Sequence, residues 1–349
     1  MIPIQNIYYM LSYAFQVLNE QGYKNIATEQ FHNTAELMAA ILEKGIAIQL
    51  KRGLGKEYIP QTEALSSLRG KIDIAESIKT QSMLRKQLIC TYDEFSVNSI
   101  MNQIIKSTVE LLLRSNISKQ RKKNLRKLMV YFSEVDFIDS YTVNWNVQYN
   151  RNNQTYRMLI SICYLVVKGL LQTQSNGHTK LMDFLDEQRM CRLYEKFILE
   201  YYRKEFKNQI TANASQIPWQ LDNEENSMLS VMQSDIMLQS GEKVLIIDAK
   251  YYEHSTQVQF DKHTLHSGNL YQIFTYVKNK EYELREKDHT VSGMLLYAKT
   301  DEEIYPNNVY QMSGNQIAVR TLDLNLPFDE IASQLNEKPN PPAMLGRME

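Results

Sequence analysis

Apolar residues recur every three or four positions in two early segments, Tyr8 to Leu18 and Ala35 to Leu50, which predicts two amphipathic helices. Between Lys51 and Ile74 the pattern changes to short runs interrupted by glycine and proline, which is typical of short strands. Helical spacing returns over a long region from about Asn98 to Phe132. The first part of the chain therefore predicts a mixed domain of helices and short β segments.

A polar stretch from Tyr149 to Gln154 interrupts this pattern. We place a domain boundary there, between residues 1–153 and 154–349. After it, helices are predicted over Tyr156 to Gln172, Asp186 to Phe206 and Gly268 to Lys278, and strands over Ser227 to Leu238, Val244 to Ala249, Val291 to Tyr297 and Ile317 to Leu324. This order predicts an α/β domain with one central mixed sheet flanked by helices.

Composition supports a globular protein of ordinary core size. Hydrophobic residues make up 43% of the 349 positions, which excludes wholesale disorder. Only 12 glycines and 8 prolines are present, which disfavours glycine-rich nucleotide-binding folds and turn-dense β-sandwiches. The formal net charge is −1, so any contact with nucleic acid must come from a local basic patch.

Cysteine usage and apolar run lengths indicate the compartment. Cys90, Cys163 and Cys191 are an odd number without metal-like spacing, so neither a disulfide framework nor a zinc site is indicated. The first residues contain no basic region before an apolar stretch, as a secretory signal would. The longest apolar run, Met158 to Val167, is about half of the ~20 residues needed to cross a bilayer. We therefore expect a soluble, cytoplasmic protein.

The most informative stretch of the sequence is a predicted hairpin between Asp235 and Lys250. Glycine at the first position of a two-residue loop is typical of a type II′ turn, so Gly241 and Glu242 are expected to form the loop. In that register, paired residues have numbers that sum to 483, and Asp235 then lies opposite Asp248. Their Cβ atoms would be about 4.5–5.5 Å apart.

A metal site would explain why the charged residues Asp248 and Lys250 occur at the end of this apolar strand. Lys250 follows Asp248 by two residues and projects from the same face. The residues before Asp248 are all Val, Leu or Ile, which indicates a buried strand where charges are costly unless paired or bound to metal. Two close carboxylates suit Mg²⁺, and Lys250 could orient or help deprotonate an attacking water. The alternative is a structural Asp–Lys ion pair opposite another acid.

Three further residues are candidates for the same site. Gln272 and Tyr276 are spaced i, i+4 on a predicted helix and share one face, where they could reach the site or a nucleic-acid backbone. Alternatively, Tyr276 lies at the edge of the core and Gln272 is solvated. Glu195 lies on a predicted helix with buried neighbours and either orients the metal site or is an ordinary surface glutamate.

The segment from Lys119 to Lys127 carries six positive residues and no acid. It could contact phosphates, although a charge run on a helix is more often a solvated face. No Walker-type loop occurs, so this chain is not expected to bind a nucleotide through one.

Taken together, these segments resemble the McrC family, the nuclease subunits of modification-dependent restriction systems. The resemblance covers nearly the whole chain, and its segments are long, ordered and correctly spaced. They are IPIQNIYYMLSYAF, RGLGKEYIPQTEALSSLRGKIDI, YDEFSVNSIMNQIIKSTVELLL, SDIMLQSGEKVLIIDAKYY and HSGNLYQIFTYV.

The resemblance implies a C-terminal nuclease domain of the PD-(D/E)xK kind. Ser234 and Asp235 stand where that motif has Pro-Asp, and Asp248, Ala249 and Lys250 form its second half. Asp235 and Asp248 would then bind Mg²⁺, and Lys250 would be catalytic. The serine replaces a proline that is not a metal ligand, so the metal site is unaffected.

The same resemblance assigns the flanking residues. Gln272 and Tyr276 resemble the Q-x-x-x-Y motif of RecB-like nucleases, and Glu195 falls where such folds often place a helix acid.

The resemblance also implies a partner for the N-terminal domain. McrC-like subunits dock on a ring of McrB-like AAA+ GTPases and stimulate its GTP hydrolysis, and the partner recognises the modified base. The leading hypothesis is therefore a Mg²⁺-dependent endonuclease subunit that cleaves double-stranded DNA carrying a modification such as 5-methylcytosine.

Two alternatives stay open. One is a partner-independent, RecB-like nuclease that processes DNA ends. The other is a catalytically idle adaptor of an AAA+ ring, against which the intact acid, acid and lysine set argues.

Overall fold

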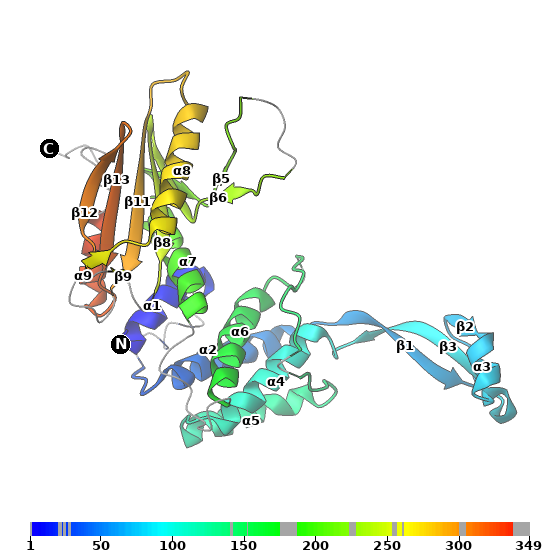
Figure 1. The fold of residues 1–349 in the computed structure, drawn as a ribbon. Coiled ribbons are helices and arrows are strands. Elements are labelled where there is room, and N and C mark those ends of the chain that lie inside the picture. The colour runs from blue at the N-terminus through cyan, green and yellow to red at the C-terminus, as the bar shows by residue number, and fades with distance from the viewer. Residues whose placement is uncertain are drawn as a thin grey trace. The chain divides into compact units, whose positions relative to one another are not determined.

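The computed structural model of the chain forms two compact units (Figure 1). The bundle unit comprises residues 28–183, and the sheet unit comprises residues 1–27 together with 184–349. The structure describes residues 2–19, 23, 26, 29–139, 142–151, 153–174, 187–222, 228–252, 257–259, 262–299 and 305–337.

This division differs from the boundary expected near residue 153. The helix that follows the polar stretch, α6 (Tyr156–Gln174), belongs to the bundle unit, where it packs against α2 (Thr34–Arg52) and α4 (Ile100–Arg114). The first helix, α1 (Ile4–Ala14), belongs to the sheet unit and packs against α7 (Glu187–Glu205). A polar stretch predicts a loop, but it does not show which other helices the flanking helices will pack against.

The bundle unit contains α2, α4, α5 (Lys119–Met129) and α6. Serine and asparagine side chains start three of these helices, because Asn33, Ser99 and Ser118 each accept a hydrogen bond from a backbone N–H three residues later. The long helical region expected over Asn98 to Phe132 is therefore divided, and the cap at Ser118 begins α5 as a separate helix.

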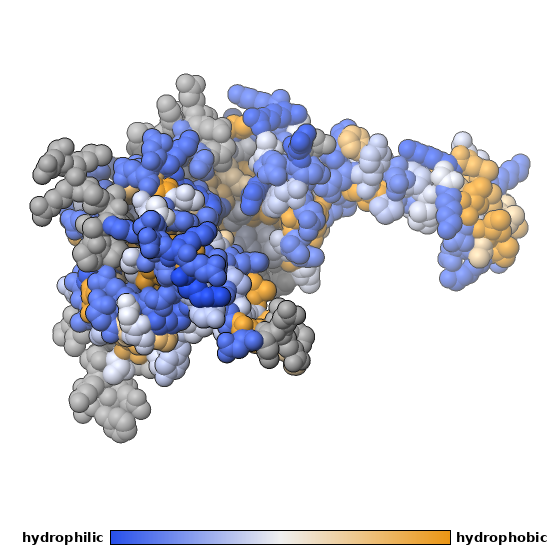
Figure 2. All heavy atoms as spheres, turned by 90° about the horizontal axis from the view of Figure 1, so that it is seen from above, coloured by the Kyte–Doolittle hydropathy of each residue, from blue (hydrophilic) through white to orange (hydrophobic). Residues whose placement is uncertain are grey.

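An antiparallel sheet extends from the bundle as an arm. It contains β1 (Glu57–Leu65), β2 (Lys71–Asp73) and β3 (Leu88–Ser96) in the order β1-β3-β2, with α3 (Ile74–Lys79) and a short 3₁₀ turn at its tip. Exposed apolar side chains gather at this tip (Figure 2). The short strands predicted between Lys51 and Ile74 are thus present, and their partner is the later strand β3.

The sheet unit is built on one six-stranded sheet. Its strand order is β12-β13-β11-β8-β7-β4, where β11 pairs in parallel with β8 and β13 and the other pairs are antiparallel. The strands are β4 (Thr211–Asn213), β7 (Ile236–Ser240), β8 (Lys243–Lys250), β11 (Thr290–Ala298), β12 (Asn308–Met312) and β13 (Asn315–Leu322). The predicted mixed α/β sheet is confirmed.

Smaller elements complete this unit. Two short antiparallel strand pairs are formed by β5 (Gln216–Ile217) with β6 (Met232–Gln233), and by β9 (Gln257–Gln259) with β10 (Lys262–Thr264). The helices besides α1 and α7 are α8 (Ser267–Glu283) and α9 (Phe328–Glu337).

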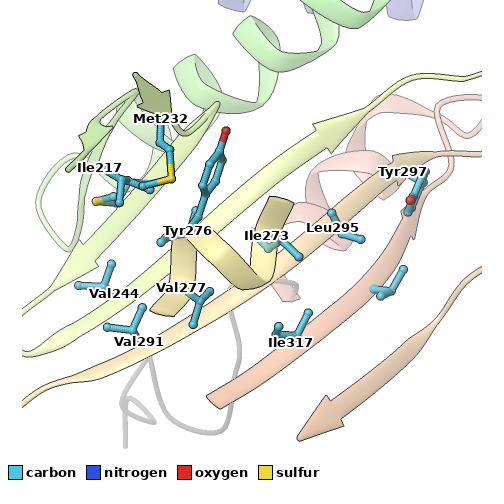
Figure 3. Packing of buried hydrophobic residues seen from close by; sticks show 13 residues of the cluster. Ile217, Met232, Val244, Ile273, Tyr276, Val277, Val291, Leu295, Tyr297 and Ile317 are labelled. Carbon is cyan, nitrogen blue, oxygen red and sulfur yellow. The ribbon is translucent and has the colours of Figure 1, made fainter. Parts of the chain in front are cut away.

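The helix α8 packs closely on the middle of the sheet (Figure 3). Its Ile273 and Val277 lie over Gly293 of β11, where an added Cβ atom would stand 2.8 Å from Ile273 Cγ1 and 2.9 Å from Val277 Cγ2. Glycine therefore permits this short helix-to-sheet distance. The packing matters for function because α8 also carries Gln272 and Tyr276.

In the described part of the chain, no helix combines the length and the apolar content that a transmembrane span requires.

Candidate active site

The hairpin at the centre of the site has the predicted register. β7 and β8 pair from Ile236 with Ile247 to Ser240 with Lys243, so every pair sums to 483. Gly241 has a φ of +56° while Glu242 does not have a positive φ, which is the type II′ arrangement. The local turn chemistry thus fixes which residues of the two strands face each other.

Asp235 lies directly before β7, at the position where this register would continue opposite Asp248. Its Oδ2 accepts a hydrogen bond of 3.0 Å from the backbone N–H of Ala249. The preceding Ser234 is buried, and its N–H donates to the carbonyl oxygen of Ser215 at 3.0 Å. The Asp235 carboxylate is therefore bound to the backbone of β8, and the residue before it is bound to the backbone of Ser215.

Asp248 and Lys250 form a buried ion pair at the end of β8. Asp248 is only 1% exposed, and the Lys250 Nζ lies 3.0 Å from its Oδ1 and 2.9 Å from its Oδ2. Oδ1 accepts a hydrogen bond from Nζ, and Oδ2 lies within ion-pair distance of the same ammonium. A carboxylate oxygen has two lone pairs, so both oxygens of Asp248 can still accept a further ligand beside Lys250.

The charges of the site shift one another's protonation. Burial raises the pKa of Asp248 to about 7, although Lys250 opposes this shift and Asp235 adds to it. Burial alone would lower the pKa of Lys250, but the Asp248 carboxylate outweighs it and raises that pKa above its usual value. Lys250 therefore stays an ammonium at neutral pH, whereas the raised pKa of Asp248 means that it takes up a proton more readily than an exposed aspartate.

Two side chains of α8 extend the polar chain that begins at Asp248. Lys250 Nζ donates to Gln272 Oε1 at 3.3 Å, and Gln272 Nε2 donates to the Tyr276 hydroxyl at 2.9 Å. Tyr276 is 8% exposed and also packs in the apolar cluster under α8 (Figure 3). Both hypotheses for Tyr276 therefore hold in part. Its ring packs in the core, and its hydroxyl is hydrogen-bonded to Gln272 of the site.

Glu195 of α7 lies near this group without bonding to it. Its Oε1 accepts a hydrogen bond of 3.1 Å from Cys191 Sγ. Burial raises the pKa of Glu195, and repulsion from Asp235 raises it further. Glu195 therefore lies close enough to sense the charge of Asp235, and its partner is the cysteine one turn earlier.

With this geometry in place, known proteins give a clear comparison. Residues 5–298 match the McrBC family, described as 5-methylcytosine restriction system components. The chain belongs to the McrBC family. A relative in Escherichia coli K12, the type IV methyl-directed restriction enzyme EcoKMcrBC, is 29% identical over 342 residues, which are 96% of each chain.

Two solved structures from Thermococcus gammatolerans are also similar to this McrBC family member. One is McrC bound to McrB AAA+ hexamers, with a TM-score of 0.49, 18% identity and coverage of 96% of this chain and 76% of that chain. The other is the McrBC complex, with a TM-score of 0.42, 22% identity and coverage of 58% and 59%.

The residues that could hold a metal in this family member are the two aspartates. Among the described residues, no group of three or more His, Cys, Asp or Glu side chains is placed to hold an ion together. Asp235 and Asp248 offer carboxylate oxygens only, and their known partners are the Ala249 N–H and the Lys250 ammonium. Mg²⁺ is usually bound by one or two carboxylates with waters and substrate phosphate, so this donor set fits it.

Sequence reasoning missed a second polar group beside the site. Asn269 donates to the Tyr297 hydroxyl at 2.9 Å and accepts from the Tyr252 hydroxyl at 3.3 Å. Asn269 precedes Gln272 by one helical turn, and Tyr252 lies two residues after Lys250. That spacing was the available signal, and the group connects the first turn of α8 with β11 and the segment after β8.

Cys191 was also missed as a neighbour of the site. Its burial and its bond to Glu195 raise the pKa of the thiol to about 12, so it is a neutral donor at physiological pH. The i, i+4 spacing of Cys191 and Glu195 was visible in the sequence, but nothing there showed that both face the sheet.

Proposed function

We propose that this chain is the Mg²⁺-dependent endonuclease subunit of a McrBC-type restriction system, with a PD-(D/E)xK site. Two observations together carry the proposal. The hairpin register brings Asp235 opposite Asp248, and Lys250 forms an ion pair with the Asp248 carboxylate. Family membership supports DNA as the substrate, and the name of the Escherichia coli relative supports a methyl-directed restriction reaction.

Each site residue has a distinct task in phosphodiester hydrolysis. Asp235 and Asp248 would hold the metal, and when bound Mg²⁺ would polarise the scissile phosphate and favour ionisation of water. Lys250 presents a permanent ammonium, because its raised pKa keeps the proton on Nζ. That charge stabilises the extra negative charge of the phosphate in the transition state, which is a better task for Lys250 than removing a proton from water.

The α8 side chains serve as positioning residues. Gln272 accepts from the Lys250 ammonium and is itself oriented by the Tyr276 hydroxyl. Since the Tyr276 ring is buried against the sheet, this relay ties the direction of Lys250 to the packing of α8. Glu195 would act through its electrostatic repulsion with Asp235. This repulsion would influence how readily the site binds a cation.

The proposal includes a partner. We assign GTP-driven movement and recognition of the modified base to a McrB-like AAA+ ring, whose GTPase this chain would stimulate. The Escherichia coli relative carries the name of the combined McrBC enzyme, which supports this assignment.

The deciding experiment is plasmid cleavage with Mg²⁺ and GTP, with and without a McrB-like partner, on methylated and unmethylated DNA. Asp248→Asn should reduce cleavage at least a hundredfold, because it removes a buried carboxylate, while stimulation of the partner's GTPase is retained. Asp288→Asn, an exposed aspartate of the same unit, is the matched control and should cleave normally.

Other results assign other functions. Cleavage by the wild-type chain alone, indifferent to partner and methylation, would indicate the RecB-like nuclease. GTPase stimulation without any cleavage would indicate the idle adaptor. Full cleavage by Asp248→Asn would show that the active site lies elsewhere.

A further inference from the structure

The helix α5 in the bundle unit has an inner face fixed by charge. Arg121 donates to Glu29 at 2.7 Å, to Glu43 at 2.9 Å and to Glu36 at 3.3 Å. Leu125, one turn later, is completely buried. Arg121 therefore forms ion pairs within the bundle unit, and these ion pairs determine which face of α5 points into that unit.

The opposite face of α5 carries exposed cations. At 100° per residue, Lys119, Lys123, Arg126 and Lys127 fall within one wedge of about 100° on the side away from Arg121. All four are exposed, and none has a hydrogen bond or ion pair within the described residues. We name these four residues the α5 stripe. The helix lies at the edge of the bundle, against α2 and α4 (Figure 1).

The cations of the α5 stripe are spaced so that they could contact several phosphates of a polyanion. Like charges on one helix face repel each other, so an anionic ligand is favoured there. Lys119 and Lys127 are about 12 Å apart along the helix, a length over which one strand of duplex DNA carries three to four phosphates. In a chain whose net charge is −1, this attraction is a local property.

We propose that the α5 stripe is a contact surface for the phosphate backbone of double-stranded DNA. The inference rests on the proposed function, which makes DNA the substrate, and it adds a binding surface in the bundle unit. An acidic protein surface fits less well, because centres of protein interfaces are apolar and depleted in charge. Here the centre is charged, and the exposed apolar residues Val130 and Tyr131 lie beyond its C-terminal end.

Binding of a 30-base-pair duplex to the full-length chain tests this surface. The variant Lys123→Glu, Arg126→Glu, Lys127→Glu is compared with wild type by fluorescence anisotropy over a range of NaCl concentrations. We expect at least a tenfold loss of affinity at ~100 mM salt, and a slope of log affinity against log salt that is smaller by about 3. The loss should be equal for methylated and unmethylated duplexes, because phosphates carry no base information.

A matched control separates the stripe from total charge. Lys71→Glu, Arg85→Glu, Lys86→Glu makes the same charge change with the same residue types, at exposed positions of the arm. This control should bind within twofold of wild type. A neutral variant with glutamine at the three stripe positions should show an intermediate loss, and thermal unfolding of each variant confirms that the chain is folded.

The outcomes decide the proposal. Equal loss in the stripe and arm variants, or no loss in the stripe variant, would overturn it. Normal DNA affinity with lost stimulation of the partner's GTPase would instead assign the stripe to an acidic protein surface. If wild type binds no duplex, the stripe proposal fails, while the cleavage test of Asp248→Asn still judges the nuclease function separately.

Discussion

At the scale of single residues, the site is organised by the competition between burial and pairing at Asp248. An aspartate that is 1% exposed would ordinarily take up a proton, and the ammonium of Lys250 only partly prevents this. Burial raises the pKa of Asp248 from its ordinary value of 3.8 to about 7 in the folded chain. The folded state therefore binds more protons than the unfolded state between those pH values.

A pH-dependent effect of Mg²⁺ on stability follows. Because the folded pKa of Asp248 is raised, stability falls as pH rises from about 4 to about 7, and a cation bound to the ionised carboxylate restores it. Saturating Mg²⁺ should raise the thermal midpoint of the sheet unit by about 5 °C or more at pH 8, and much less at pH 6. Differential scanning calorimetry without DNA measures this.

The variant Asp248→Asn supplies the comparison for this effect. It should abolish the Mg²⁺-dependent shift at both pH values, and without Mg²⁺ at pH 8 it should be at least as stable as wild type. A midpoint in wild type that does not respond to Mg²⁺ at pH 8 would contradict the assignment of Asp248 as a ligand.

At the scale of elements, the contact of α8 with β11 sets the distance between the α8 side chains and Lys250. Gly293 is the residue that permits it, since any side chain there meets Ile273 and Val277. Overpacking of this kind costs about 1–3 kcal/mol. A small displacement of α8 would also draw Gln272 away from Lys250, where the present distance is already 3.3 Å.

Gly293→Ala should therefore reduce cleavage at least tenfold and lower the thermal midpoint of the sheet unit by a few degrees, while DNA affinity is retained. Gly268→Ala in the first turn of α8 is the matched control, because no heavy atom lies within 4 Å of its added Cβ. Cleavage and DNA anisotropy on the same preparations check both variants. A Gly293→Ala enzyme with normal cleavage would show that α8 tolerates displacement.

The elements also show what the sequence could and could not predict. The hairpin was predictable in register because Ser240, Gly241 and Glu242 contain the whole turn signal. The placement of Asn269 and Cys191 was not, because their partners come from other elements and no local pattern marks them. The two compact units divide the chain elsewhere than at residue 153 for the same reason, since helix α6 packs against α2 and α4, which come earlier in the sequence.

At the scale of the whole molecule, the sheet unit is closed by the first helix of the chain. Asn6 of α1 donates to the carbonyl oxygens of Leu324 and Leu326, both at 2.8 Å. Tyr9 stacks on Phe328 of α9 with ring centroids 4.4 Å apart. These contacts join residues that are more than 300 positions apart in the sequence.

Asn6→Ala should therefore destabilise the sheet unit although it lies far from the site in sequence. Losing both hydrogen bonds leaves the buried carbonyl of Leu324 and the half-buried carbonyl of Leu326 without this partner, at a cost of about 1–3 kcal/mol. The midpoint should fall by roughly 4–8 °C. Hydrogen exchange should show faster opening of α9 and β13, with unchanged protection in α2 and α4. Equal loss of protection in α2 and α4 would contradict the division into units.

The closure by α1 also has a consequence for synthesis of the chain. A ribosome releases α1 first, but the carbonyl groups that bind Asn6 are made only after some 300 further residues. At ~5–20 residues per second, α1 waits for its partners for roughly 15–60 s. A chain that ends after Lys250 but before Leu324 would contain Asp235, Asp248 and Lys250 without the hydrogen bonds made by Asn6. Such incomplete chains would therefore lack contacts that stabilise the unit carrying the two aspartates and the lysine.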